Sequence, residues 1–160
     1  MPQTTGQKKC PYSKRRYWYH VSTTLGKKHE YLTPWGEKKG FNRSGDEPDG
    51  DRICVAPTIE QCLTAIPYYL GTVCTVYKTK SPVFATKPHG IFDAKVTEEG
   101  WIQTPTAFVK VGILRFEDIE KSLGVENVVE QAASKGELKQ SRKVLQWWRM
   151  ARLRRFIKRA

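Results

Sequence analysis

The chain lacks any run of apolar residues long enough to cross a bilayer as a helix, which takes about 18 to 20 of them. Its basic N-terminal stretch is also not followed by the apolar segment of a secretory signal. We therefore expect neither secretion nor a membrane anchor, and we expect a cytoplasmic location.

Cysteine and histidine are scarce, with four residues of the first and three of the second. No CxxC pair occurs, and only His20 and His29 are close in sequence, so we expect no metal site. Cys54, Cys62 and Cys74 stand among aliphatic residues. This setting predicts reduced thiols buried in the core, as in a reducing compartment.

Several common catalytic motifs are missing. The sequence contains no GxxxxGK[ST] phosphate loop, no GxSxG elbow, no HExxH and no GxGxxG. These absences disfavour P-loop hydrolysis, ordinary serine hydrolysis, zincin chemistry and Rossmann-type binding. A metal-free nuclease using His20, His29 and a Lys or Arg stays an alternative, although nothing specific in the sequence favours it.

What the chain has in excess is positive charge, +12 in total, and this charge lies at the two ends. Residues 1–16 carry five bases and no acid. Residues 137–160 carry one acid, Glu137, and nine bases: Lys139, Arg142, Lys143, Arg149, Arg152, Arg154, Arg155, Lys158 and Arg159. Such basic ends are typical of binding to nucleic acid, to an acidic protein or nucleoprotein, or to an anionic membrane face.

With 160 residues, of which 39% are hydrophobic, the chain can bury one core. We predict a basic tail over 1–16, a core domain over 17–116 and a helical extension over 117–160. Strands are predicted over 17–22, 52–56, 72–77, 82–85, 101–102 and 107–114, with a long loop over 24–50. A capping box from Thr58 to Gln61 predicts a helix after it. The fold class is therefore α+β, with a curved antiparallel or mixed sheet and one packed helix.

The C-terminal segment predicts an amphipathic helix. Its stripe at three-to-four spacing comprises Leu138, Leu145, Trp148, Arg152 and Phe156, and basic residues fill most other positions. We interpret the nine bases as nucleic-acid-binding residues, with Trp147 free to stack or wedge. Two alternatives are a helix that only docks on the core and a helix that lies on an anionic membrane.

A second group of motifs resembles a known family by its order along residues 17–116. The motifs are Tyr19-His20-Val21-Ser22, Leu32-Thr33-Pro34, Asn42-Arg43, Ile53-Cys54-Val55-Ala56-Pro57-Thr58, Val76-Tyr77, and Asp93-Ala94-Lys95-Val96-Thr97-Glu98. Together they resemble small bacterial ADP-ribosyltransferases of the rifampin-modifying type. The sequence departs from that family at Val21, where a Gly is usual, and at Ile53, where an aromatic residue is usual.

The resemblance implies NAD as cofactor. It implies that His20 holds the ribose and that the segment from Arg52 to Thr58 walls the nicotinamide pocket, with Ser22, Arg52 and Thr58 as cofactor-binding residues. A carboxylate, Asp93 or one of Glu98 and Glu99, would assist transfer. Loss of nicotinamide builds positive charge on the ribose, which a carboxylate stabilises, while a neutral imidazole can fix the sugar by hydrogen bonds.

Two functions follow. The first is an ADP-ribosyltransferase-like enzyme that modifies a protein or nucleic acid held by the basic ends. The second is a non-catalytic protein, an inhibitor or accessory factor, that binds nucleic acid or nucleoprotein through its cationic C-terminal helix. An origin in a phage or mobile element would suit either function.

Overall fold

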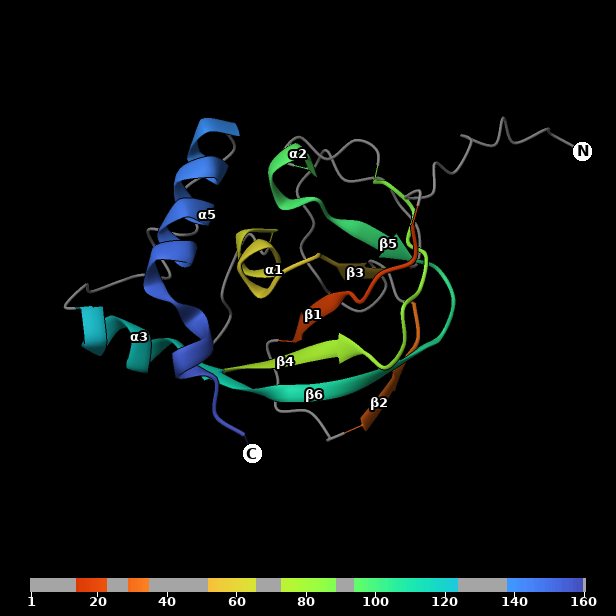
Figure 1. Ribbon diagram of the computed structural model, residues 1–160, viewed down its shortest axis with the longest axis horizontal. Helices are drawn as coiled ribbons and strands as arrows, with labels where there is room; N and C mark the ends of the chain where they lie inside the picture. Colours follow the sequence, from red (N-terminus) through yellow and green to blue (C-terminus); the bar gives the residue numbers. More distant parts are fainter. Residues whose placement is uncertain are drawn as a thin grey trace, which may run out of the picture.

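The computed structural model describes residues 14–22, 29–34, 52–65, 73–88, 94–123 and 138–159 (Figure 1). The strands are β1 (Tyr19–Ser22), β2 (His29–Leu32), β3 (Ile53–Val55), β4 (Val73–Thr79), β5 (Gly100–Ile102) and β6 (Thr106–Arg115). The helices are α1 (Ile59–Ala65), α2 (Ala94–Thr97), α3 (Phe116–Leu123) and α5 (Leu138–Ala151), followed by the 3-10 helix η2 (Leu153–Phe156). The predicted α+β class is confirmed.

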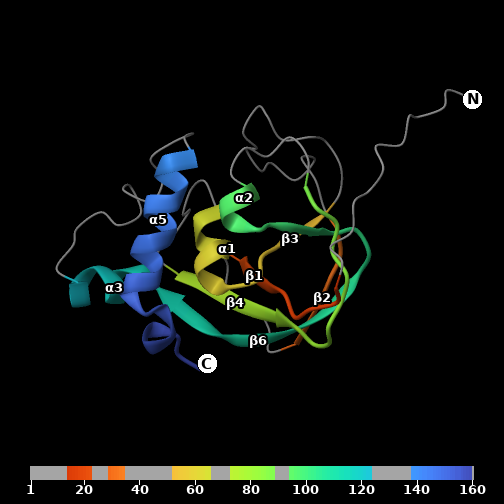
Figure 2. The same cartoon turned by 45° about the horizontal axis from the view of Figure 1, so that its top comes forward.

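The strands form an antiparallel four-stranded sheet in the order β1-β4-β6-β2 and a two-stranded sheet of β3 and β5. A bridge between Tyr19 and Ala56 connects the two sheets, with N–O distances of 2.8 and 3.0 Å. In Figures 1 and 2 the smaller sheet lies above β1, while β4 and β6 run below it. The predicted curved antiparallel sheet is therefore present.

A bulge contributes to this curvature. The register between β4 and β6 shifts between Val76, which pairs with Gly112, and Tyr77, which pairs with Lys110. The extra residue, Val111, lengthens β6 locally, and such a bulge bends its strand and increases the twist.

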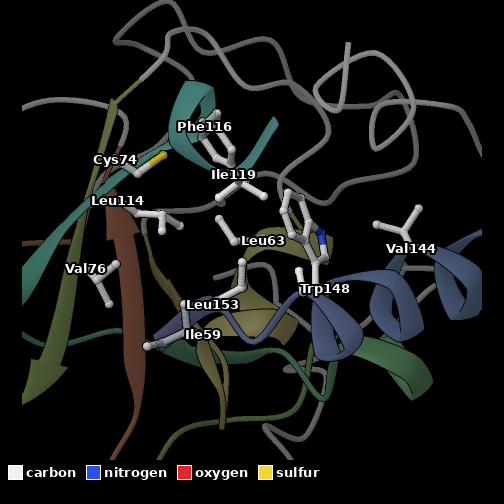
Figure 3. Packing of buried hydrophobic residues seen from close by; sticks show 11 residues of the cluster. Ile59, Leu63, Cys74, Val76, Leu114, Phe116, Ile119, Val144, Trp148 and Leu153 are labelled. Atoms are coloured by element: carbon white, nitrogen blue, oxygen red, sulfur yellow. The ribbon is translucent and has the colours of Figure 1, made fainter. Parts of the chain in front are cut away.

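Helices cover one face of the four-stranded sheet (Figure 3). The buried residues there are Ile59, Leu63, Cys74, Val76, Leu114, Phe116, Ile119, Val144, Trp148, Ala151 and Leu153. They come from α1, α3, α5 and η2 as well as from β4 and β6, and α5 packs directly on α1. The C-terminal helix is thus part of the same core as the sheet.

A second cluster lies on the other face of the sheet, between β4, β6 and the small sheet. It comprises Trp18, Ile53, Val55, Tyr77, Ala85, Ile102 and Phe108. Because side chains alternate along a strand, Val76 faces the helices while its neighbour Tyr77 faces this second cluster. At its edge, Gly100 allows a close approach, since a Cβ there would lie 2.9 Å from the Cβ of Ala85 and 3.0 Å from the ring of Trp18.

The predicted C-terminal helix ends earlier than its apolar stripe suggests. α5 stops at Ala151, and Arg152 adopts a left-handed conformation with φ 53°. The prediction that Arg152 and Phe156 continue the same helix is therefore wrong. The turn at Arg152 still lets Leu153 enter the core, so tertiary packing overrides the helical period.

After η2 the chain joins the sheet. Lys158 pairs with Ile113 of β6, with N–O distances of 2.8 and 2.9 Å. This approach requires a glycine, because a Cβ on Gly112 would lie 2.5 Å from the Cγ2 atom of Ile157 and 2.7 Å from the carbonyl oxygen of Lys158. A backbone hydrogen-bond pair therefore holds the basic C-terminal segment against β6.

Three local predictions are corrected. The predicted loop over 24–50 contains strand β2, which pairs with β6. Residues 82–85 form no strand: Val83 makes an isolated bridge with Arg16, and Thr86, just after this range, makes one with Trp101. Cys54 is exposed rather than buried, because Ile53 and Val55 occupy the inward positions of this short strand. Cys62 and Cys74 are buried as predicted.

No helix in the described ranges is long and apolar enough to cross a membrane.

Candidate functional site

His20 lies at the second position of β1, directly opposite Tyr77 of β4. Its ring centroid lies 5.9 Å from that of Phe108 and 6.4 Å from that of Tyr77. The imidazole is half-buried, on the same face of the sheet as these two aromatic rings. Two apolar rings therefore flank the predicted ribose-binding histidine.

A hydrogen bond to the backbone of β3 fixes the imidazole. Its Nδ1 atom lies 2.8 Å from the carbonyl oxygen of Cys54. A carbonyl can only accept, so Nδ1 carries the proton in this bond. Burial lowers the pKa of His20 below its ordinary value of 6.5, and the bond to Cys54 offsets part of that effect. At neutral pH the ring is thus uncharged, and its Nε2 atom is a hydrogen-bond acceptor.

A fourth side chain on this face is an acid that no sequence motif indicated. Glu30 of β2 pairs with Phe108 of β6, which contacts His20. Burial raises the pKa of Tyr77, and the Glu30 carboxylate raises it further. His20, Tyr77, Phe108 and Glu30 therefore form a diagonal row across all four strands, which we call the His20 face. Only strand pairing places them together, so no local motif could have revealed the group.

Ser22 shares the His20 face, because it lies two residues beyond His20 on the same strand. Its side chain is half-buried. Of the predicted cofactor-binding residues, Ser22 is the one that the sheet itself places beside His20.

Thr58 forms the N-terminal cap of helix α1. Its hydroxyl accepts a hydrogen bond from the backbone N–H of Gln61 at 3.2 Å and donates to Oε1 of Gln61 at 2.9 Å. This arrangement caps α1, as the Thr58–Gln61 pattern predicted. A sugar hydroxyl at this position would have to share the Thr58 oxygen with the helix cap.

Glu98 is connected to the same cap. The buried Gln61 donates from Nε2 to Oε2 of Glu98 at 2.8 Å and to the carbonyl oxygen of Val96 at 3.2 Å. Glu98 itself is exposed and has a positive φ of 50°, which is uncommon outside glycine. An exposed carboxylate held by a buried amide is thus oriented without being removed from solvent.

Arg52 lies on the other side of the small sheet. Its guanidinium stacks over the Trp101 ring at 4.0 Å, and the indole N–H of Trp101 donates to Glu99 at 3.2 Å. Ile53 and Val55 face the second cluster with Tyr77 and Phe108, so Arg52 alternates to the opposite face. The structure therefore does not place Arg52 beside His20. The predicted residue Asp93 lies outside the described residues.

The basic C-terminal residues form a second candidate site. The side chains described are Arg142, Lys143, Arg149, Arg152, Arg154, Arg155, Lys158 and Arg159, and all are exposed. We call them the C-terminal cationic surface; of the predicted set, the side chain of Lys139 falls outside the described part. Lys158 also lies 3.6 Å from the Asp118 carboxylate.

Trp147 is not free to stack on a ligand as predicted. It is half-buried, packs against the helix-side core and meets Trp148 edge-on at a centroid distance of 4.5 Å. The aromatic residues of α5 therefore serve packing, and the polar side of the helix offers charge.

Among the described residues, no group of three or more His, Cys, Asp or Glu is placed to hold a metal ion. Comparison with family models, with curated proteins and with solved structures yields no match.

Proposed function

We propose that the chain is an ADP-ribosyltransferase-like protein that binds NAD on the His20 face. One observation carries the proposal: Nδ1–H of His20 is directed to the Cys54 carbonyl, and the rings of Tyr77 and Phe108 flank the imidazole. A ribose needs a fixed acceptor for its hydroxyls, and the half-buried imidazole of His20 supplies one, held in place by the buried rings of Tyr77 and Phe108.

The proposed reaction is transfer at the nicotinamide ribose. The bond from the ribose C1′ to the nicotinamide nitrogen breaks, and nicotinamide leaves with the electron pair. A nucleophile of the acceptor then bonds to C1′ and releases its proton. Positive charge grows on the sugar between these events, and a carboxylate nearby lowers the barrier. Two of the predicted acids have hydrogen-bonded carboxylates: Glu98, which accepts from Gln61, and Glu99, which accepts from Trp101. Of these, Glu98 is exposed, and we propose it for this role.

The test is release of nicotinamide from NAD by the purified protein, with and without cellular protein and RNA as acceptors. His20→Ala should lower the rate by about a hundredfold, the usual effect of removing one positioned catalytic group. Tyr31→Ala, at an exposed position of the same sheet, is the matched control and should keep the wild-type rate. Equal rates for wild type and His20→Ala would refute the assignment.

A second candidate function has its own observation. Residues 138–159 contain no acid, all eight side chains of the C-terminal cationic surface are exposed, and the β6 pairing at Lys158 holds the segment in place. Solvated cations in a fixed array suit the phosphates of nucleic acid or nucleoprotein, because each ion pair with a phosphate releases counterions. We propose that this surface holds the polyanion, either as the acceptor or as the partner of a non-catalytic binding protein.

The test replaces Arg149, Arg152, Arg154 and Arg155 together with Gln and measures duplex DNA binding against salt. For each phosphate that the variant no longer neutralises, the slope of log K on log salt should become shallower by about 0.9. A control variant, Lys95→Gln with Lys121→Gln, removes two exposed charges from the neighbouring helices α2 and α3 and should change the slope less than the four-Arg variant does. An unchanged slope in the four-Arg variant would exclude this surface.

A further inference from the structure

A second basic surface lies around the start of β1 and the end of β4. Arg16 pairs with Val83, which brings residues 14–18 alongside residues 80–86. In this arrangement the Arg15 guanidinium lies over the Phe84 ring at 5.1 Å. The Lys78 ammonium lies over the Tyr17 ring at 4.5 Å. We call Arg15, Tyr17, Lys78, Lys80 and Phe84 the aromatic–cation strip.

The strip carries one sign of charge, and all of its side chains are exposed except Lys78, which is half-buried. Tyr17 is 45% exposed and Phe84 is 51% exposed, which is high for such large rings. The described segments 14–22 and 73–88 contain no Asp or Glu. Their bases are Lys14, Arg15, Arg16, Lys78, Lys80 and Lys87. Because β4 and the 80–88 segment supply half of these bases, the surface extends beyond the basic N-terminal tail noted in the sequence.

This strip and the C-terminal cationic surface lie at opposite ends of the molecule. In both Figures 1 and 2, the start of β1 and the segment after β4 run side by side at the right, while α5 stands at the left. A ligand on the strip therefore does not depend on α5 for its contacts.

We propose that the aromatic–cation strip binds single-stranded nucleic acid. Bases stack on exposed aromatic rings and on guanidinium planes, and neighbouring lysines take the phosphates. Tyr17 and Phe84 with Arg15 above it supply the stacking surfaces, and Lys78 and Lys80 supply the charge. A base-paired duplex hides its base faces, so charge alone would serve it and the exposed rings would add nothing. The proposal is independent of the His20 face and adds a binding element outside the C-terminal cationic surface.

The experiment measures fluorescence anisotropy of a labelled twenty-nucleotide thymidine oligonucleotide, with a duplex of equal length and heparin as further probes. The full chain is compared with Tyr17→Ala/Phe84→Ala, which keeps every charge. Tyr31→Ala removes a ring that is 68% exposed on β2 and serves as the matched control. Arg149→Gln/Arg155→Gln removes charge at the opposite end.

The double aromatic variant should bind the single strand at least about tenfold more weakly, since stacking is worth that much per base. Its affinity for heparin, which has no bases, should stay within twofold of wild type, as should single-strand binding by Tyr31→Ala. Circular dichroism and the melting temperature show whether the variant is folded; if it is not, Tyr17→Leu/Phe84→Leu replaces it, because leucine keeps bulk and has no stacking face.

Two results would overturn the proposal. One is an unchanged single-strand affinity in the folded aromatic variant. The other is an equal weakening of single-strand and heparin binding, which would make the strip a general polyanion or acidic-protein surface. Both outcomes are separate from NAD binding, which the His20 variants report.

Discussion

The Nδ1 atom of His20 lies 2.8 Å from the carbonyl oxygen of Cys54, so the backbone of β3 fixes a side chain of β1. The neighbouring residues Tyr19 and Ala56 form the bridge between the two sheets. The orientation of the imidazole therefore depends on how the two sheets join. The position of Nε2, and hence the binding of a ligand that contacts it, depends on that junction as well.

The stability of the protein should depend on the charge state of His20. Burial places the pKa of the folded state below the 6.5 of an unperturbed histidine. Below pH 6.5 the unfolded chain therefore binds more protons than the folded chain, and the free energy of unfolding falls as the pH falls. Urea denaturation between about pH 5 and 7 should show this slope, and His20→Asn should flatten it. Parallel curves for the two proteins would show that His20 contributes nothing to it.

Gln61 should matter for stability more than an ordinary glutamine. It is buried, and its side chain bonds to Thr58, Val96 and Glu98. Gln61→Leu leaves these groups without that partner and should cost about 1 to 3 kcal/mol in urea denaturation. Gln103→Leu, at an exposed position, is the control and should change stability little. Equal midpoints for the two variants would mean that water replaces the network at no cost.

Gly112 should be required for docking of the C-terminal segment. A Cβ there would clash with Ile157 and with the Lys158 carbonyl, and backbone cannot yield as a flexible side chain does. We expect Gly112→Ala to cost about 1 to 3 kcal/mol, the usual range for overpacking. The same substitution in a chain ending at Phe156 should cost much less, because both clashing groups are gone. A similar cost in both chains would place the strain elsewhere.

Glu30 should control the ionisation of Tyr77. Its negative charge disfavours the phenolate and helps to raise the pKa of Tyr77 above 10. Glu30→Gln removes that charge and should lower this pKa, while the part due to burial stays. Titration of ring-labelled tyrosines by NMR measures the shift. An unchanged pKa of Tyr77 in Glu30→Gln would show that the two residues do not interact, and Glu30 would then not belong to the His20 face.

Local sequence rules predicted much of the fold. The Thr58–Gln61 capping box marked the start of α1, and β-branched runs marked β4 and β6. These predictions succeed because a cap and a buried strand are both encoded within a few neighbouring residues. Strand β2 was not predicted, because His29–Leu32 has no strong alternation of polar and apolar residues and is stabilised by pairing with β6.

The site was less predictable for the same reason. His20 was visible from its motif, but its partners Cys54, Tyr77, Phe108 and Glu30 are far from it in sequence. Arg52 was grouped with His20 by motif order, yet strand alternation turns it to the other face. Likewise, the turn at Arg152 is set by how Leu153 packs, which the helical period cannot reveal.

The most direct test of the central claim is a calorimetric titration of the purified chain with NAD. We predict saturable binding at one site, abolished in His20→Ala and retained in Arg149→Gln/Arg155→Gln, because the site depends on the imidazole and not on the cationic surface. Absence of any binding heat or thermal shift in the wild-type protein would contradict the account and leave the basic surfaces as its functional elements.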